Sequence, residues 1–311
     1  MRGTELFARP SEPPPWRDDV LDFEYLDARA CRRRYAGASA AAAAACGHRY
    51  TSFMVDMPRY MRFLMREVAR RGGTFRRRAV DPARPHAHGV AGPVSVVVNC
   101  LGLAAERAAG NKKGGDYGTL TPARGHTVRV RAPFIDEFLV MLEDGSPPTY
   151  ILPRGNGVVV LGGTHDENAT DCGTSAARDA DTASILARTR ALLPSLAARS
   201  SEVEMLGTWT GLRPERAGGV MLGKVDAGSG GGGVPVLANY GHGGSGVTLA
   251  WGCAEEVVKL VDDVVGGPTG TSRMTTNKTT ARPVVGSPAA RLPRACPEDT
   301  LVTIRPGNAA T

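Results

Sequence analysis

The chain has 311 residues, enough for one large domain or two interleaved domains with a sizeable core. Apolar residues make up 42% of it, no apolar run reaches the ~18 residues of a membrane span, and the N-terminus lacks an apolar signal core, so we expect neither membrane insertion nor secretion. The formal net charge is +7, but the low aromatic content and the lack of helix-turn-helix or zinc spacing favour a solvated arginine-rich surface over nucleic-acid binding.

The N-terminal part of the chain mixes strand patterns with polar segments. Residues 1–15 are polar and proline-rich and predict a loose lead-in. Residues 20–26 alternate apolar and acidic side chains, which is typical of a half-buried strand. The alanine-rich residues 36–46 fit either a short helix or an unstructured insertion, and the pattern does not separate the two. Residues 50–55 predict another strand.

A helix and two strands are predicted next. Asp56 is placed to cap a helix whose apolar residues recur at helical spacing, and Gly72 and Gly73 end it. Residues 75–80 predict a strand. Residues 94–100 form a continuous apolar and β-branched run, which is typical of a fully buried parallel strand.

The middle of the chain predicts antiparallel strands. Residues 127–130 and 138–142 alternate in the period of a strand. Residues 150–152 and 158–161 predict a hairpin, because the Asn-Gly pair that begins at Asn156 is a strong turn signal between them.

The C-terminal part of the chain predicts a strand, a glycine-rich turn and a long helix. Residues 181–193 have the pattern of an amphipathic helix. Residues 236–238 predict a short strand that enters the glycine-rich turn 239–246, and an apolar helix follows up to residue 265. The tail from Thr271 has little periodicity, so we expect it to be disordered.

Three patterns suggest chemistry. The turn NYGHGGSG lets the backbone approach a ligand closely, and the helix after it presents unpaired N–H groups and a partial positive charge; alone, it fits a simple tight turn equally well. In TGLRPER, Arg213 suits a carboxylate clamp, with a surface ion pair as the alternative. Tyr150 enters a strand, where a tyrosine is more often a core or rim residue.

The cysteines predict neither a disulfide framework nor a metal site. They are far apart in the sequence and form no C-x-x-C pair, which favours a reducing compartment. The six are Cys31, Cys46, Cys100, Cys172, Cys253 and Cys296.

These patterns together resemble the D-amino-acid oxidase and D-aspartate oxidase family. The blocks VVVNCLG, GGDYGTLTPARGHTVRV, TYILPRGNGVVVLGGT, GLRPER and ANYGHGGSGVTLAWGCAEEVVKL follow one another in the order and spacing of that family. Upstream, WRDDVLDFEYL and YTSFMVDMPRYMRFLMREVARRGGTF are similar to its middle region. The resemblance covers residues 13–265.

The resemblance implies an α/β (mixed α+β) fold. In it, an incomplete Rossmann-like FAD-binding domain is interleaved with an antiparallel-sheet substrate domain of the D-amino-acid oxidase type. The expected division is a lead-in with the first part of the substrate domain at 1–92, FAD-binding parts at 93–120 and 209–268, the rest of the substrate domain at 121–208, and a disordered tail at 269–311.

The resemblance also implies an enzyme that oxidises D-amino acids to 2-oxo acids with release of ammonia and hydrogen peroxide. Members of the family transfer a hydride from the substrate Cα directly to FAD, so the protein positions the reactants rather than supplying an acid or base. The expected partners are a small-molecule D-amino acid and oxygen, with no nucleic acid and no membrane, and a homodimer stays open. The expected localisation is cytoplasmic or peroxisomal, although the C-terminal residues Ala309-Ala310-Thr311 are not a peroxisomal tripeptide.

Roles are implied for individual residues by the same resemblance. Arg213 matches the arginine that pairs with the substrate carboxylate, Tyr150 matches a tyrosine that helps to hold it, and Gly244 matches the glycine whose carbonyl accepts from the substrate amine. Leu101 stands where relatives often carry a threonine that contacts FAD, so that hydroxyl contact is lost. The residues expected to bind FAD are Val80, Leu101, Arg213, Gly243, Gly244, Gly246, Val247 and Thr248.

Departures from the family pattern leave alternatives open. No G-x-G-x-x-G fingerprint for the FAD pyrophosphate stands near the N-terminus, so the resemblance implies an N-terminally truncated member, and an inactive remnant is one alternative. D-aspartate oxidase or another flavin amine oxidase is the other. If His165, Asp166 and Glu167 face the substrate pocket, they favour neutral or basic D-amino acids over D-aspartate; otherwise they are loop surface.

Overall fold

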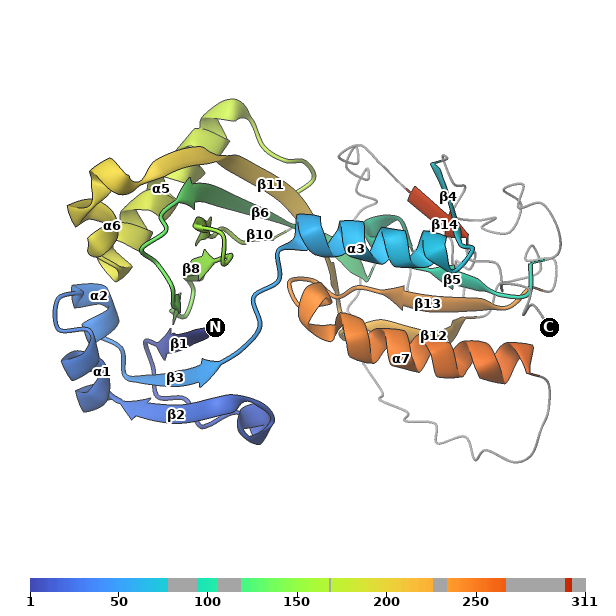
Figure 1. The fold of residues 1–311 in the computed structure, drawn as a ribbon, viewed down its shortest axis with the longest axis horizontal. Helices are drawn as coiled ribbons and strands as arrows, with labels where there is room; N and C mark the ends of the chain where they lie inside the picture. The colour runs from blue at the N-terminus through green and yellow to red at the C-terminus, as the bar shows by residue number, and fades with distance from the viewer. Residues whose placement is uncertain (78–93, 106–118, 168, 226–233, 267–299, 304–311) are drawn as a thin grey trace. The chain divides into compact units, whose positions relative to one another are not determined.

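The computed structural model describes residues 1–77, 94–105, 119–167, 169–225, 234–266 and 300–303 (Figure 1). It divides into two compact units that interleave along the chain. The first unit comprises Met1–Met65, Arg124–Asp166 and Cys172–Gly211. The second comprises Arg66–Ala123, Glu167–Asp171 and Leu212–Thr311.

A large mixed sheet forms the framework of the first unit. Its order is β10-β6-β9-β8-β7-β1-β3-β2, and β11 pairs with β6. Strand β1 pairs with β7 in parallel, whereas β8 pairs with β7 and β9 in antiparallel fashion. The strands are β1 (Arg2–Phe7), β2 (Leu21–Asp27), β3 (Cys46–Thr51), β6 (Leu120–Arg131), β7 (Phe138–Leu142), β8 (Thr149–Pro153), β9 (Val158–Gly162), β10 (Asp166–Glu167) and β11 (Glu204–Arg216).

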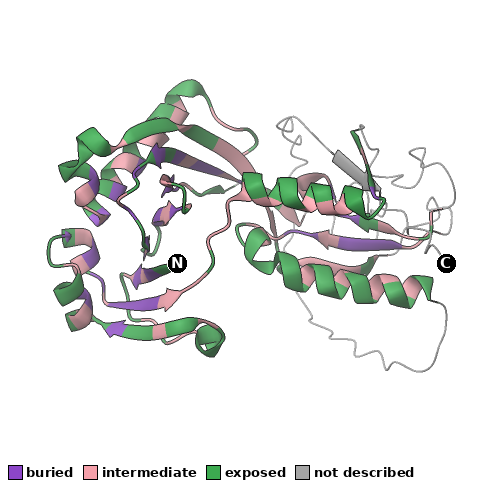
Figure 2. Cartoon of the chain, in the orientation of Figure 1, coloured by how far each residue is buried: buried purple, intermediate pink, exposed green. Residues whose placement is uncertain are grey.

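Helices pack on this sheet and enclose the main hydrophobic core. Helix α5 contacts β8, β9 and α2, so residues such as Ile185 and Leu192 meet Ile151 and Leu161 in one buried cluster. In Figure 2, several strands of this sheet are coloured as buried. The helical segments of the first unit are η1 (Pro15–Asp19), α1 (Ala28–Arg34), α2 (Ser39–Ala42), α5 (Ser175–Leu192), α6 (Ser195–Ala198) and η3 (Ser200–Glu202), and α3 (Met57–Arg70) follows β3 into the second unit.

The second unit contains a smaller sheet and a long helix. Its three described strands lie in the order β12 (Met221–Val225), β13 (Val236–Tyr240) and β5 (Val97–Asn99), and the 3-10 turn η2 (Gly102–Ala104) follows β5. Strand β13 pairs with β5 in parallel and with β12 in antiparallel fashion. Helix α7 (Gly246–Val265) packs along β12 and β13 (Figure 1). The mixed α/β class is thereby confirmed.

Two strands contradict the sequence predictions. The expected lead-in 1–15 contains β1, which lies between β3 and β7 with Thr4 and Leu6 buried. The tail expected to be disordered contains β14 (Thr300–Thr303), which pairs with β4 (Thr74–Arg77). Both strands exist because of partners distant in sequence, which no local pattern reports.

Other predictions are confirmed with shifted boundaries. The expected hairpin is formed by β8 and β9, and the run at 94–100 contains the parallel strand β5. That strand is not fully buried, because it lies at the edge of the described three-stranded sheet and Val98 is 38% exposed. The strand expected at 50–55 ends at Thr51, and the undecided segment 36–46 contains the short helix α2.

No helix in the described ranges combines the length and apolar content that crossing a membrane requires.

Candidate active site

The glycine-rich turn lies between buried strand β13 and the first turn of α7. Gly241 and Gly243 have φ of 81° and 53°, the left-handed region that side chains rarely adopt. A Cβ on Gly241 would stand 2.8 Å from the Cβ of Arg216, so glycine is required there for space as well as conformation. Gly241, Gly243 and Gly246 have the G-x-G-x-x-G spacing between a strand and a helix, a spacing that was looked for only near the N-terminus and not found there.

The N-terminus of α7 is open to a ligand. Ser245 occupies the N-cap position but makes no side-chain cap hydrogen bond, so its side chain satisfies none of the first-turn N–H groups that lack intrahelical partners. Val247 and Thr248, in that first turn, are exposed. The positive end of a 20-residue helix therefore faces outward, with uncapped donors that favour an anionic or carbonyl acceptor.

Arg213 lies beside this turn, at the end of β11. A Cβ on Gly244 would stand 3.9 Å from Cδ and 4.0 Å from Nε of Arg213, so the half-buried Arg213 side chain lies alongside Gly244. The backbone holds the two segments together: the Gly243 N–H donates to the Pro214 carbonyl at 2.9 Å, and Glu215 and His242 form an antiparallel bridge. The structure thus brings together Arg213, Gly243 and Gly244, three residues for which the resemblance implies roles at the substrate or the cofactor.

Leu101 lies in the turn after β5. The Leu101 N–H donates to Oδ1 of Asn99 at 3.1 Å, and its side chain packs against the small buried cluster that contains Ala238 and Tyr240. A Cβ on the neighbouring Gly102 would stand 3.8 Å from Cγ of Pro214. The turn after β5 and the segment that carries Arg213 are therefore adjacent. Val80, the other expected FAD contact, lies outside the described residues.

Tyr150 belongs to the first unit, on strand β8. It pairs across the sheet with Gly162, and its ring covers the Gly162-Gly163 backbone so closely that a Cβ on either glycine would overlap it. The Tyr150 ring therefore packs directly on the backbone of these two glycines, where no side chain would fit.

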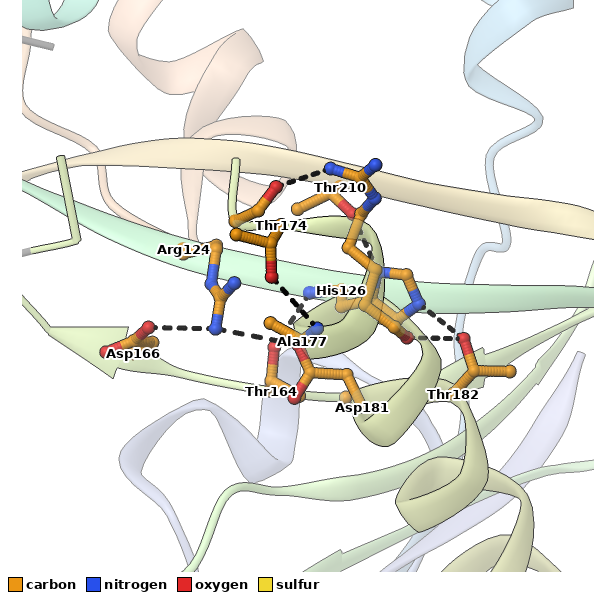
Figure 3. A network of polar contacts seen from close by, with 12 residues as sticks. Arg124, His126, Thr164, Asp166, Thr174, Ala177, Asp181, Thr182 and Thr210 are labelled. Carbon is orange, nitrogen blue, oxygen red and sulfur yellow. Dashed lines mark hydrogen bonds and ion pairs between the residues drawn. The ribbon is translucent and has the colours of Figure 1, made fainter. Parts of the chain in front are cut away.

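A buried histidine organises polar groups near the middle of β6 (Figure 3). His126 is fully buried, with Nδ1 2.6 Å from Oγ1 of Thr210 on β11 and Nε2 2.9 Å from Oγ1 of Thr182 on α5. The Thr182 hydroxyl donates its single proton to the Arg178 carbonyl at 2.8 Å, so it must accept from Nε2–H of His126. In the neutral ring, Nδ1 therefore accepts from Thr210.

The acidic residues after β9 are partly compensated by the same network. Asp166 lies 3.0 Å from Arg124, whose side chain also approaches Asp181 at 3.6 Å. His165 and Glu167 are exposed. If Asp166 faced the substrate pocket, its pairing with Arg124 would weaken its repulsion of an acidic substrate.

Burial lowers the pKa of three histidines, His48, His126 and His242. A lowered pKa favours the neutral imidazole in the folded chain. Above the unfolded-state pKa of about 6.5, the histidines are neutral in both states and the folded chain keeps its full stability. As the pH falls below that value, the unfolded chain takes up protons first, so the free energy of unfolding decreases. We expect the free energy of unfolding to fall between pH 7 and pH 5. Urea unfolding across this range measures the slope, and His126→Gln, neutral at every pH, should make it shallower; an unchanged slope in that variant would contradict the assignment.

The chain is similar in sequence to known oxidoreductases. The family model described as FAD dependent oxidoreductase, DAO, matches residues 4–260. The D-amino-acid oxidase of Rubrobacter xylanophilus is 36% identical over 260 residues, which cover 83% of this chain and 70% of that protein. The D-aspartate oxidase of Homo sapiens is 32% identical over 270 residues, covering 85% and 70%.

Solved structures agree at the level of the fold. The glycine oxidase of Geobacillus kaustophilus superposes with a TM-score of 0.60 at 19% identity, over 84% of this chain and 70% of that one. The family model spans the glycine-rich turn, Arg213 and Tyr150 alike. The chain belongs to the DAO family of FAD-dependent oxidoreductases.

Proposed function

We propose that the chain oxidises D-amino acids in an FAD-dependent reaction. Water and oxygen are consumed, and a 2-oxo acid, ammonia and hydrogen peroxide are released. The observation that supports this most directly is Arg213 beside Gly244: a cation that binds carboxylates bidentately lies next to an exposed glycine whose carbonyl can accept from an amine. An α-amino acid carries its amine and its carboxylate on one carbon, Cα.

The residues of the second unit fit FAD. The left-handed glycines keep side chains out of the turn, and the uncapped N-terminus of α7 favours negative charge. The residues that would hold FAD are those of the turn after β5, including Leu101 through its backbone, and Gly243, Gly244, Gly246, Val247 and Thr248. When bound, FAD supplies the electron acceptor for the substrate Cα–H bond and passes the electrons to oxygen.

The protein's own task is to orient the substrate. Arg213 would fix the carboxylate with two parallel hydrogen bonds. Tyr150 matches the tyrosine that helps to hold this carboxylate in the family that the sequence resembles, and we assign it the same role. The Gly244 carbonyl would accept from the substrate nitrogen, which fixes the direction of the Cα–H bond and selects one enantiomer. Orientation of this kind can supply much of the rate enhancement without an acid or a base.

The absorbance spectrum of the purified chain tests the proposal. The chain is incubated with FAD, desalted and then mixed with D-alanine or L-alanine under nitrogen. We expect a retained flavin band that bleaches with the D-enantiomer only. A retained band that neither enantiomer bleaches, with no response to a panel of neutral, basic and acidic D-amino acids, would contradict the proposed substrate class but not the cofactor.

A further inference from the structure

The guanidinium of Arg188 joins two backbone segments in the first unit. Arg188 lies on α5, and its Nη1 donates to Oγ1 of Thr149 at 2.6 Å while its Nη2 donates to the Gly163 carbonyl at 2.7 Å. Longer contacts run from Nη1 to the carbonyls of Pro147 and Pro148 at 3.4 and 3.5 Å. The Arg188 side chain therefore forms hydrogen bonds with both the start of β8 and the segment that follows β9.

Both segments belong to the surroundings of Tyr150. Thr149 immediately precedes Tyr150, and Gly163 is one of the two glycines against which the Tyr150 ring packs. A Cβ on Gly163 would stand 2.6 Å from the Tyr150 hydroxyl oxygen. The Gly163 N–H also donates to the Pro148 carbonyl at 2.8 Å, so the same two segments are tied twice. A shift of either segment would move the phenol.

Desolvation of the Arg188 guanidinium costs free energy, and its hydrogen bonds must compensate for that cost. Within the described residues, every hydrogen bond of Arg188 goes to a neutral oxygen, including the Ser184 hydroxyl at 3.4 Å. Burial lowers the pKa of Arg188, and Glu143, Tyr150 and Asp181 oppose that effect. A hydrophobic side chain would fill the space without the desolvation cost, but it would leave the Gly163 carbonyl unbonded and the two segments untied.

We propose that Arg188 is the positioning residue for Tyr150, holding its hydroxyl at the height and angle at which it binds the substrate carboxylate. The inference rests on the proposed function in one respect, that Tyr150 binds this carboxylate. Lysine cannot replace the arginine, because a single ammonium cannot span the Thr149 hydroxyl and the Gly163 carbonyl in a fixed plane.

A double-mutant cycle tests the proposal with the full chain loaded with FAD. Arg188→Met and Arg188→Lys are each expected to raise KM for the D-amino acid about tenfold, the effect of losing one charged hydrogen bond, with a much smaller change in kcat. In a Tyr150→Phe background, the same substitutions should leave KM unchanged, because the hydroxyl that they position is gone. Arg190→Met, exposed on the same helix, is the matched control and should match the parent.

A second readout does not depend on activity. Tyrosine ring signals are recorded by NMR on ¹³C-tyrosine-labelled chain, and Tyr150→Phe identifies the Tyr150 signal. We expect that signal to shift or broaden in both Arg188 variants and to stay in place in Arg190→Met. An unmoved signal, a KM increase that persists in the Tyr150→Phe background, or a wild-type Arg188→Lys would each overturn the proposal. A wild-type KM in Tyr150→Phe alone would instead overturn the proposed role of Tyr150.

Discussion

Replacing Arg213 by lysine is expected to lower kcat/KM for D-amino acids on the order of 100-fold. Bidentate binding of a carboxylate uses two charge-assisted hydrogen bonds in one plane, and losing the planar fork costs about 3 kcal/mol. The loss should be seen mainly in KM if the guanidinium binds substrate and transition state equally, and in kcat as well if it also orients the Cα–H bond.

Steady-state kinetics with D-alanine measure this effect, and Arg131→Lys is its control. Arg131 lies on β6, is about half exposed and pairs with Glu204 at the surface, so its replacement should leave kcat/KM within about twofold of the parent. A retained flavin band in Arg213→Lys would show that the cofactor is still bound. Equal kinetics of Arg213→Lys and the parent would remove Arg213 from the substrate site.

The parts of this site that were predictable from sequence are those whose geometry is local. The turn between β13 and α7 was predictable because a cluster of glycines stands between a short strand pattern and an apolar helical pattern. The β8–β9 hairpin was predictable because Asn156-Gly157 fixes its turn. In both, neighbouring residues determine the conformation.

The parts that were missed depend on residues far apart in the chain. Strand β1 exists because β3 and β7 pair with it on either side, and no pattern inside residues 2–7 reports those partners. His126 meets Thr182 and Thr210, which are 56 and 84 residues away. Arg188 was not distinguishable from other arginines of α5, because its role depends on the Gly163 carbonyl rather than on helical periodicity.

Gly241 shows how a conformational requirement becomes visible only in three dimensions. In the sequence it is one of several glycines in the turn, and the resemblance pointed instead to Gly243, Gly244 and Gly246. In the structure it is buried, has a φ of 81° and faces the Arg216 side chain. Its φ determines where the chain leaves β13 and therefore where the first turn of α7 begins.

Replacing Gly241 by alanine is therefore expected to lower the free energy of unfolding by about 2–4 kcal/mol and to weaken FAD binding more than about tenfold. The left-handed conformation alone costs a non-glycine residue about 1–3 kcal/mol. The new Cβ would also meet the Cβ of Arg216 at 2.8 Å, an atom that only backbone movement can displace. Urea unfolding and an FAD titration followed by flavin fluorescence measure the two effects.

Gly252→Ala is the matched control, because Gly252 lies in α7, the helix that follows the turn. Gly252 lies inside α7, and a methyl group added there would have no neighbouring atom within 4 Å, so alanine fits without a clash. Because glycine costs about 0.5–1 kcal/mol in a helix relative to alanine, this variant should be slightly more stable and should bind FAD normally. If Gly241→Ala behaved like Gly252→Ala, the turn would tolerate a side chain at position 241, and the start of α7 would not depend on a left-handed glycine there. If the two diverge as expected, the position of the α7 N-terminus, and the charge that it offers to a ligand, is set by the backbone conformation of one residue.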